Sequence, residues 1–411
     1  MPLAFRDSLT GRRLPVPRPA GRPLTMYVCG PTIYARAHVG HGRNYLYFDL
    51  LRRYFRDQDQ PIRHVMNITD YEDKVTERAA ALGLTWRELA RREERGFLAD
   101  FQRLGLLPPH ETPRASAFVS EMIRYAKALA QTGRTEWDGD ELYFTPDPAT
   151  DPENFPVGQE LSEHAVLEPG QPPPGSDPRA RRVLLFRRQV PPAASWSSPW
   201  GPGAPGWTLE CYAMAKRYLG VPVDLHGGGM DLIFPHHYSE NAVSLTLDGD
   251  PFARRFLYTG FVTEEGRKMS KSIGNLVPLG DALDQFGMSA LRWYLMTPRY
   301  NMRLEWDVST VERARVEWET LRARARSTLQ PGHGGTLRSA ELSRVVARVV
   351  RRFEDGFGVD GALDELRNWS DRVGGAPIPR FERGAIRGAK AHYLRLERLL
   401  GLDLTGPGGR G

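Results

Sequence analysis

A strand, a loop, a helix and a second strand follow one another near the N-terminus, and this order constrains the fold more than any other feature. The apolar run PLTMYVCG (residues 23–30) leads into a proline, which predicts a buried strand followed by a loop. We expect a helix from about His41 to Phe55 and a second strand within residues 60–69. Such units build parallel sheets that bind ligands at the carboxyl ends of their strands. The sequence therefore predicts an α/β protein.

The start of the predicted helix carries two histidines, His38 and His41, with Gly40 between them and Gly42 after them. A helix N-terminus has unpaired N–H groups and a partial positive charge, so it suits an anion. Ring N–H groups would strengthen such a site, and glycines would let the anion come close. We predict a phosphate ligand here.

A second basic segment, RKMSKSIGN, carries Lys268 and Lys271 between Gly266 and Gly274. A flexible loop with two ammonium groups can close on a polyphosphate and neutralise the charge of its leaving group. Taken alone, the segment could equally be a solvated basic turn. Together with the histidine-led helix, it favours a nucleotide site.

The segment HGGGMDLIFPHHYSEN contains three consecutive glycines and then His236 and Glu240, four residues apart. The glycines permit close approach to a base or ribose. His236 and Glu240 would share one face of a helix, and Cys29 and Cys211 are the only cysteines. Two thiolates, an imidazole and a carboxylate form a sensible zinc set. The alternative is a structural histidine beside a surface glutamate.

Length and composition fit a soluble protein of two or three domains. The chain has 411 residues, of which 40% are hydrophobic and 26% charged. It has no apolar run long enough to cross a membrane, and its N-terminus lacks the apolar core of a signal peptide. We therefore expect a cytoplasmic protein with no membrane partner.

The net charge of +6 permits an anionic partner without requiring one. Much of the excess is arginine, in the runs 179–188 and 313–326. Either run could be a solvated face or could contact phosphates.

The remaining segments give a coarse order of elements. The Pro-rich stretch 145–178 predicts an insertion or loop, and a Gly-rich break at 331–335 precedes two or three helices that end near Leu404. Helical patterns cover 74–104, 116–131 and 278–327, and strand patterns cover 223–229 and 254–263.

These motifs, in this order, resemble the class I aminoacyl-tRNA synthetases and specifically the cysteinyl-tRNA synthetase family. HVGH (residues 38–41) is similar to the HIGH signature of that class, and KMSKS (residues 268–272) matches its second signature letter for letter. MYVCGPTIY, NITDYEDK, SPWGPGAPGWTLEC and HGGGMDLIFPHH also resemble cysteinyl-type segments. The similarity covers roughly residues 24–310.

The resemblance implies a Rossmann-like (HUP-type) parallel-sheet catalytic domain followed by an α-helical bundle. The expected division is an N-terminal extension (1–24), two catalytic halves (25–110 and 191–280) around a connective insertion (111–190), a helical linker (281–330), a helical domain (331–404) and a disordered tail (405–411).

The resemblance also implies ATP-dependent activation of L-cysteine to cysteinyl-adenylate, with Mg²⁺, and transfer to tRNA(Cys). By resemblance, the triphosphate lies at His38, Gly40 and His41, the pyrophosphate at Lys268 and Lys271, and the adenosine near Gly227, Gly229 and Asp231. Thr69 and Trp207 match the amino-acid pocket. One zinc ion, held by Cys29, Cys211, His236 and Glu240, would bind the substrate thiolate and reject serine.

Three alternatives remain open. The family usually continues into a small anticodon-reading domain, and this sequence resembles a short form without it. A related cysteine ligase of mycothiol biosynthesis, which acts on an amino-sugar inositol, has a similar length, but CGPTIY, Lys74, His226 and Glu240 are typical of the synthetase. A non-catalytic regulatory paralogue is the third alternative. We expect a monomer.

Overall fold

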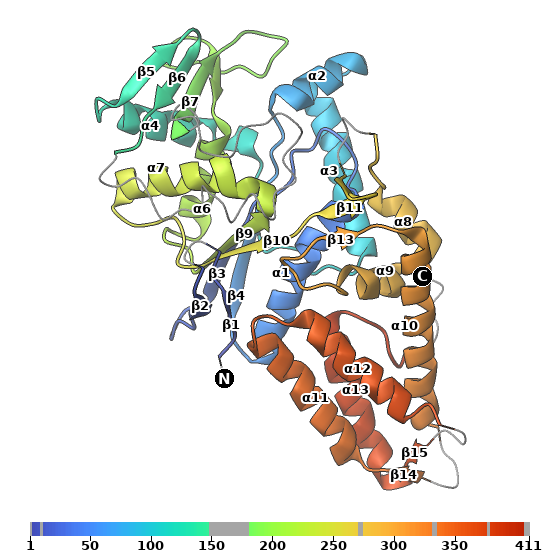
Figure 1. Cartoon of the computed structure of the whole chain (residues 1–411). Helices are drawn as coiled ribbons and strands as arrows, with labels where there is room; N and C mark the ends of the chain where they lie inside the picture. The colour runs from blue at the N-terminus through green and yellow to red at the C-terminus, as the bar shows by residue number, and fades with distance from the viewer. Residues whose placement is uncertain are drawn as a thin grey trace.

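A four-stranded parallel sheet lies at the centre of the computed structural model, which describes residues 2–8, 11–147, 181–269, 274–330, 335–375 and 379–406 (Figure 1). Its strands, in spatial order, are β10 (Phe256–Thr259), β9 (Leu225–Gly229), β3 (Leu24–Val28) and β4 (Ile62–Met66). Each neighbouring pair is parallel. The predicted α/β class is therefore confirmed.

The two faces of this sheet belong to two different hydrophobic cores. Side chains alternate along β3, so Leu24, Met26 and Val28 enter one core while Tyr27 and the following Cys29 enter the other. The first core includes helix α1 (Val39–Asp57), which connects β3 to β4. The second includes α6 (Trp207–Tyr218) and α7 (Tyr238–Asp248).

A second, antiparallel sheet lies on the α6 and α7 side of the molecule (Figure 1). It consists of β5 (Thr135–Asp138), β6 (Glu141–Phe144), β7 (Val183–Arg188) and β8 (Gly203–Pro205), with α4 (Val119–Ala130) beside it. The sheet continues past residue 190, where the sequence placed the end of the insertion. Residues 148–180, which include most of the Pro-rich stretch, lie outside the described residues.

Two helices follow β4, in the region where the sequence predicted helical patterns over 74–104. They are α2 (Asp73–Ala81) and α3 (Trp86–Arg103). Gly83, with φ of +67°, makes the turn between them, a conformation that favours glycine. Thr85 then caps α3, because its side chain and that of Glu88 exchange hydrogen bonds with each other's backbone.

Six helices follow the second half of the parallel sheet. They are α8 (Leu279–Phe286), α9 (Met288–Leu295), α10 (Val308–Thr328), α11 (Ser339–Glu354), α12 (Val359–Arg372) and α13 (Ile386–Leu400). The last three confirm the predicted helices of the C-terminal segment. Helix α13 packs along α1, so this segment shares the first hydrophobic core (Figure 1).

Short strands and turns complete the described structure. An N-terminal hairpin, which the sequence did not predict, pairs β1 with β2. Their bounds, and those of the other short elements, are β1 (Ala4–Arg6), β2 (Arg13–Pro15), β11 (Val262–Glu264), β12 (Arg267–Lys268), β13 (Leu304–Glu305), β14 (Gly335–Leu337), β15 (Arg380–Phe381), η1 (Ala115–Ala117), η3 (Met230–Leu232), η4 (Ile233–His237) and η5 (Arg383–Ala385).

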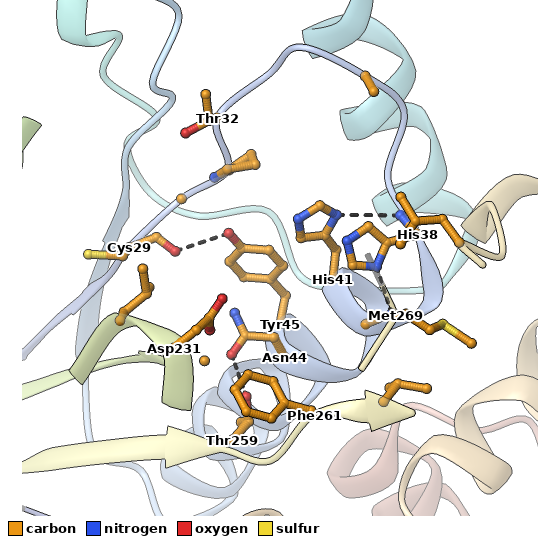
Figure 2. Close-up of a pocket in the computed structure, with 18 of the residues that line it drawn as sticks. Cys29, Thr32, His38, His41, Asn44, Tyr45, Asp231, Thr259, Phe261 and Met269 are labelled. Carbon is orange, nitrogen blue, oxygen red and sulfur yellow. Dashed lines mark hydrogen bonds between the residues drawn. The ribbon is translucent and has the colours of Figure 1, made fainter. Parts of the chain in front are cut away.

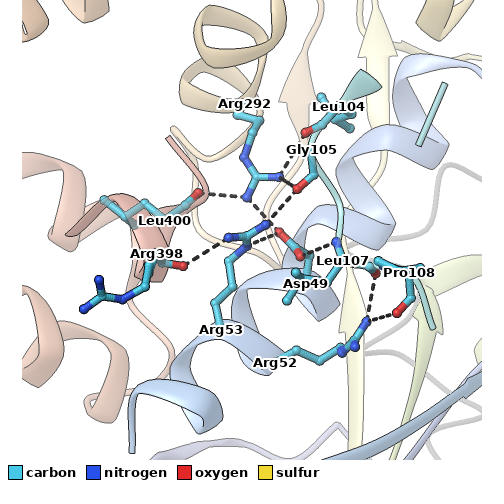
Figure 3. A network of polar contacts seen from close by, with 10 residues as sticks. All are labelled: Asp49, Arg52, Arg53, Leu104, Gly105, Leu107, Pro108, Arg292, Arg398 and Leu400. Carbon is cyan, nitrogen blue, oxygen red and sulfur yellow. Dashed lines mark hydrogen bonds and ion pairs between the residues drawn. The ribbon is translucent and has the colours of Figure 1, made fainter. Parts of the chain in front are cut away.

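A buried arginine joins α1 to three other helices (Figure 3). Arg292 of α9 is fully buried and binds Asp49 of α1 at 2.7 Å. It also donates to the carbonyl of Leu104 at the end of α3 and to that of Leu400 at the end of α13. Burial alone would raise the pKa of Asp49, but the charges of Arg292 and Arg53 hold it below its usual value.

No described helix is long and apolar enough to span a membrane.

Candidate active site and metal centre

A pocket of about 400 Å³ opens at the carboxyl ends of the parallel strands (Figure 2). Strand β3 leads into Cys29, β9 ends at Gly229, and β10 ends at Thr259, and all three residues line the pocket. The sheet therefore brings segments that are distant in sequence to one edge, as parallel sheets with bound ligands do.

The N-terminus of α1 forms one wall of this pocket. His38 is the N-cap residue, and its Nδ1 atom accepts a hydrogen bond from the Gly40 N–H at 3.1 Å. The His38 and His41 rings lie 3.9 Å apart, and both face the pocket together with Gly40 (Figure 2). The two histidines and the helix N-terminus thus lie together, as the motif predicted.

The segment with the two lysines reaches the same pocket through Met269, whose side chain lines it (Figure 2). Lys268 belongs to β12, which pairs with β11. Lys271 lies outside the described residues. Val39 of α1 donates its N–H to the carbonyl of Val277, so the backbone that follows this segment is fixed to the start of α1.

The glycine triplet contributes to both the pocket and the packing. Gly229 and Asp231 line the pocket. Gly227 lies outside the pocket lining and faces α1, where a side chain would overlap the Phe48 ring. Its lack of a side chain therefore serves the contact between β9 and α1.

The four predicted metal ligands converge next to the pocket. Cys29 Sγ lies 3.6 Å from Cys211 Sγ and 3.5 Å from Glu240 Oε1. His236 Nε2 lies 3.4 Å from Cys211 Sγ and 3.1 Å from Glu240 Oε1. Tetrahedral zinc, with bonds of about 2.3 Å to sulfur and about 2.0–2.1 Å to nitrogen or oxygen, separates neighbouring ligand atoms by roughly 3.3–3.8 Å. The observed spacing fits this geometry to within a few tenths of an ångström.

Electrostatics also favour a cation at this centre. All four side chains are buried. Burial raises the pKa of the Cys29 thiol, whereas the contacts of Cys211 with Cys29 and His236 outweigh burial and bring its pKa to about 7. The charges of His226 and His236 outweigh burial at Glu240 and hold its pKa well below its usual value. Buried anionic groups need a compensating charge, which a divalent metal supplies.

Two further histidines support the metal centre and were not among the predicted ligands. His226 Nε2 contacts Glu240 Oε2 at 2.7 Å, and its Nδ1 contacts the Tyr27 carbonyl. His237 bridges the hydroxyl of Tyr258 and Cys29 Sγ. Cys29, His226, His237 and Glu240 also lie close enough together to form a ligand set. However, the 2.7 Å contact between His226 and Glu240 is well below the roughly 3.3 Å that separates two ligands of tetrahedral zinc, so we place these histidines around the ligands.

The structure places the two predicted amino-acid pocket residues, Trp207 and Thr69, in different surroundings. The Trp207 ring stacks on the His236 ring at 3.9 Å and lines the active-site pocket. Thr69 is buried, outside the lining of that pocket, and donates a hydrogen bond to Glu210 at 2.9 Å. Burial raises the pKa of Glu210 well above its usual value, with the negative charge of Cys211 adding to the effect.

Comparison with known proteins places this fold and site in a family. A family model for the catalytic domain of class I (C) tRNA synthetases matches residues 17–316. Among solved structures, methionyl-tRNA synthetase of Mycobacterium tuberculosis with methionyl-adenylate has a TM-score of 0.63 at 19% identity, covering 92% of this chain and 89% of that one. LeuRS of Agrobacterium radiobacter K84, in a ternary complex with tRNA, has a TM-score of 0.59 at 12% identity, covering 94% and 86%. At these identities the structures show a shared fold.

The chain therefore belongs to the class I tRNA synthetases. Two relatives narrow the assignment. The cysteine--tRNA ligase of Aeropyrum pernix is 36% identical over 378 residues, which are 87% of this chain and 77% of that protein. The cysteine--tRNA ligase of Streptomyces avermitilis is 33% identical over 386 residues, which are 93% and 81% of the two chains. Within its class, the chain belongs to the cysteine--tRNA ligase family.

Proposed function

We propose that this protein activates L-cysteine with ATP at a zinc-bearing site and transfers it to tRNA(Cys). Membership of the family supports a ligase that forms aminoacyl-tRNA. The single observation that carries the choice of cysteine is the buried Cys29, Cys211, His236 and Glu240 set beside the nucleotide pocket.

The phosphate end of the pocket would be served by α1. Its N-terminal N–H groups and the rings of His38 and His41 bind the ATP triphosphate, together with Mg²⁺. Lys268 and Lys271 neutralise the charge that develops on the departing pyrophosphate. Gly229 and Asp231 bind the adenosine beside the end of β9, and Gly227 allows α1 to pack there. Such a site needs to position the reacting groups and neutralise the phosphate charge rather than supply covalent chemistry.

The amino-acid end would be served by the metal centre. Zinc held by the four ligands supplies an attachment point that prefers a thiolate to a hydroxyl. Trp207 holds the His236 ring in place by stacking on it, and Thr69 orients the substrate amine beside Glu210. Because shape alone discriminates weakly between cysteine and serine, this preference replaces an editing step.

The domain division predicted from the sequence is part of the proposal, with one adjustment. The connective insertion is taken to the end of β8 at Pro205, because β8 completes the antiparallel sheet. The acceptor is tRNA rather than a small amine, which the two cysteine--tRNA ligase relatives support.

Pyrophosphate exchange and tRNA charging test the proposal together. Purified protein is incubated with ATP, labelled pyrophosphate and either cysteine or serine, and then with labelled cysteine and total tRNA. We expect exchange with cysteine, none with serine above background, and acid-precipitable label on tRNA.

Each negative result removes a different part of the proposal. Absence of cysteine-dependent exchange would overturn the activity and leave a non-catalytic paralogue. Exchange without tRNA charging would move the acceptor to a small amine, such as an amino-sugar inositol. A Lys271→Ala variant tests the phosphate end of the site independently of the metal end, because it should slow pyrophosphate exchange and still bind zinc.

A further inference from the structure

Several of the arginines that the sequence grouped into basic runs are engaged by acidic side chains. On the antiparallel sheet, Arg182 binds Glu136 and Asp138, and Arg187 binds Asp73 and Glu141. On α10, Arg315 binds Glu312 and Glu319. These paired arginines keep little net charge to attract an anion.

Helix α3 presents a different arrangement. Arg87, Arg91 and Arg95 are exposed and follow one another at intervals of four, so they lie along one face. Arg87 lies over the Trp86 ring at 4.1 Å. Within the ranges that the structure describes, Arg91 and Arg95 make no ion pair or side-chain hydrogen bond.

These side chains surround a pocket of about 480 Å³, which we call the α3 pocket. Its lining residues are Asp70, Trp86, Arg87, Ala90, Arg91, Glu94, Arg95, Leu98, Arg114 and Ser116. Two carboxylates are present, but Glu94 is held by Arg114 at 2.8 Å, and Asp70 accepts hydrogen bonds from Ser116. Four guanidinium groups against two carboxylates leave a net positive charge.

Three observations connect the α3 pocket, or the helix that carries it, to the active site. Asp70 directly follows Thr69, which the proposed function assigns to the cysteine pocket. On the same helix, Asp100 binds Arg36 at 2.9 Å, and Arg36 lines the active-site pocket. The Phe97 ring also contacts the His41 ring, with centroids 5.8 Å apart. The helix that carries these arginines therefore also contacts the active-site pocket.

We propose that the α3 pocket binds the sugar–phosphate backbone of the acceptor RNA close to its 3′ end. This inference rests on the proposed function, because the 3′ end must reach the activated amino acid in the neighbouring pocket. Guanidinium groups with no acidic partner suit phosphates, since each contact releases a condensed counterion and costs no broken ion pair. The exposed, evenly spaced arginines fit a backbone that runs along the helix.

The test compares two variants of the full chain on the same helix. The Arg91→Ala/Arg95→Ala double variant removes the two unpaired guanidinium groups. The control is Arg92→Ala. Arg92 is exposed on the same helix, lies outside the α3 pocket and binds Glu93. Both proteins are assayed for cysteine-dependent pyrophosphate exchange, which uses no RNA, and for tRNA charging at several salt concentrations.

We expect the double variant to lose roughly tenfold or more in kcat/KM for tRNA, mainly through KM, and to keep exchange within about twofold of wild type. The slope of log(kcat/KM) against log[salt] should fall by about 1 to 2, and the control should match wild type.

The outcomes separate this inference from the function on which it rests. Charging by the double variant that equals wild type in rate and salt slope overturns the RNA contact and leaves the synthetase activity standing. Equal losses in exchange and charging also overturn it, because they indicate general damage to the protein. A wild-type protein without exchange or charging removes the proposed function itself.

Discussion

The Cys211 sulfur contacts two other proposed zinc ligands, Cys29 and His236. We expect Cys211→Ser to reduce bound zinc from about one ion per chain to near zero, because a hydroxyl is a far weaker zinc ligand than a thiolate. Metal analysis of the purified protein measures the loss, and ATP binding should persist. Ser244→Ala, a buried change on α7 near Glu240, is the control and should keep its zinc. Full zinc occupancy in Cys211→Ser would contradict the ligand assignment.

A substitution of His226 tests whether the histidines around the proposed zinc ligands support metal binding. Its Nε2 atom contacts Glu240, so His226→Gln should weaken zinc binding by about 10- to 100-fold rather than abolish it. Titration with a competing chelator measures this affinity. A variant with unchanged zinc affinity would show that Glu240 is held by His236 and the metal alone.

His64 makes stability depend on pH. Burial in β4, with Arg52 and His110 adding to the effect, lowers its pKa well below the usual value. As the pH falls below about 6.5, the unfolded chain binds a proton that the folded chain does not, so the free energy of unfolding decreases by up to about 1.4 kcal/mol per pH unit. His64→Leu should therefore lose less stability than wild type between pH 7.5 and 5.5. Urea unfolding at both pH values measures the difference, and equal losses would contradict the assignment.

Part of the candidate site carries a local signal in the sequence. His236 and Glu240 share helical spacing, and His38 and His41 stand at a helix N-terminus. The hydrogen bond between His237 and Tyr258 joins η4 to β10, and no spacing in the sequence indicates it. Likewise, the packing role of Gly227 depends on Phe48, which lies on a helix distant in sequence.

Among the elements, α1 is held by one buried and one surface ion pair, which makes a matched comparison possible. Arg292 and Asp49 are both buried, whereas Arg395 of α13 and Asp57 of α1 form a partly exposed pair at 2.8 Å. Arg292→Met should lower the free energy of unfolding by about 3 kcal/mol, because it leaves Asp49 buried with Arg53 alone. Arg395→Met should cost about 0–1 kcal/mol. Chemical denaturation measures both, and equal costs would contradict the role of the buried pair.

Strong periodic patterns predicted the elements of the parallel sheet and the C-terminal helices, but short elements escaped prediction. β1 and β2 have only three residues each, and this hairpin is anchored because Leu3 and Phe5 are buried in the first hydrophobic core. The helical patterns over 74–104 do not show where α2 ends and α3 begins, because a glycine inside a helical pattern is ambiguous until its φ is known. In both cases tertiary contacts or backbone geometry decided the outcome.

For the molecule as a whole, the C-terminal helices and α1 belong to one hydrophobic core. The Tyr54 ring of α1 stacks on Phe353 of α11 at 5.9 Å, and Leu399 and Leu400 of α13 are buried in the same cluster. Residues on both sides of the predicted domain boundary at residue 331 therefore belong to the first hydrophobic core.

This shared core predicts that α1 and α13 unfold together. Hydrogen exchange of the full chain, followed by mass spectrometry across a denaturant series, should give peptides from the two helices the same opening free energy. Arg292→Met should lower both values by the same amount, because the residue contacts both helices, whereas Arg395→Met should change both by about 1 kcal/mol at most. If α13 opened about 2 kcal/mol more easily than α1, the C-terminal helices would be a separately folding unit, and the shared core would not couple them to the active site.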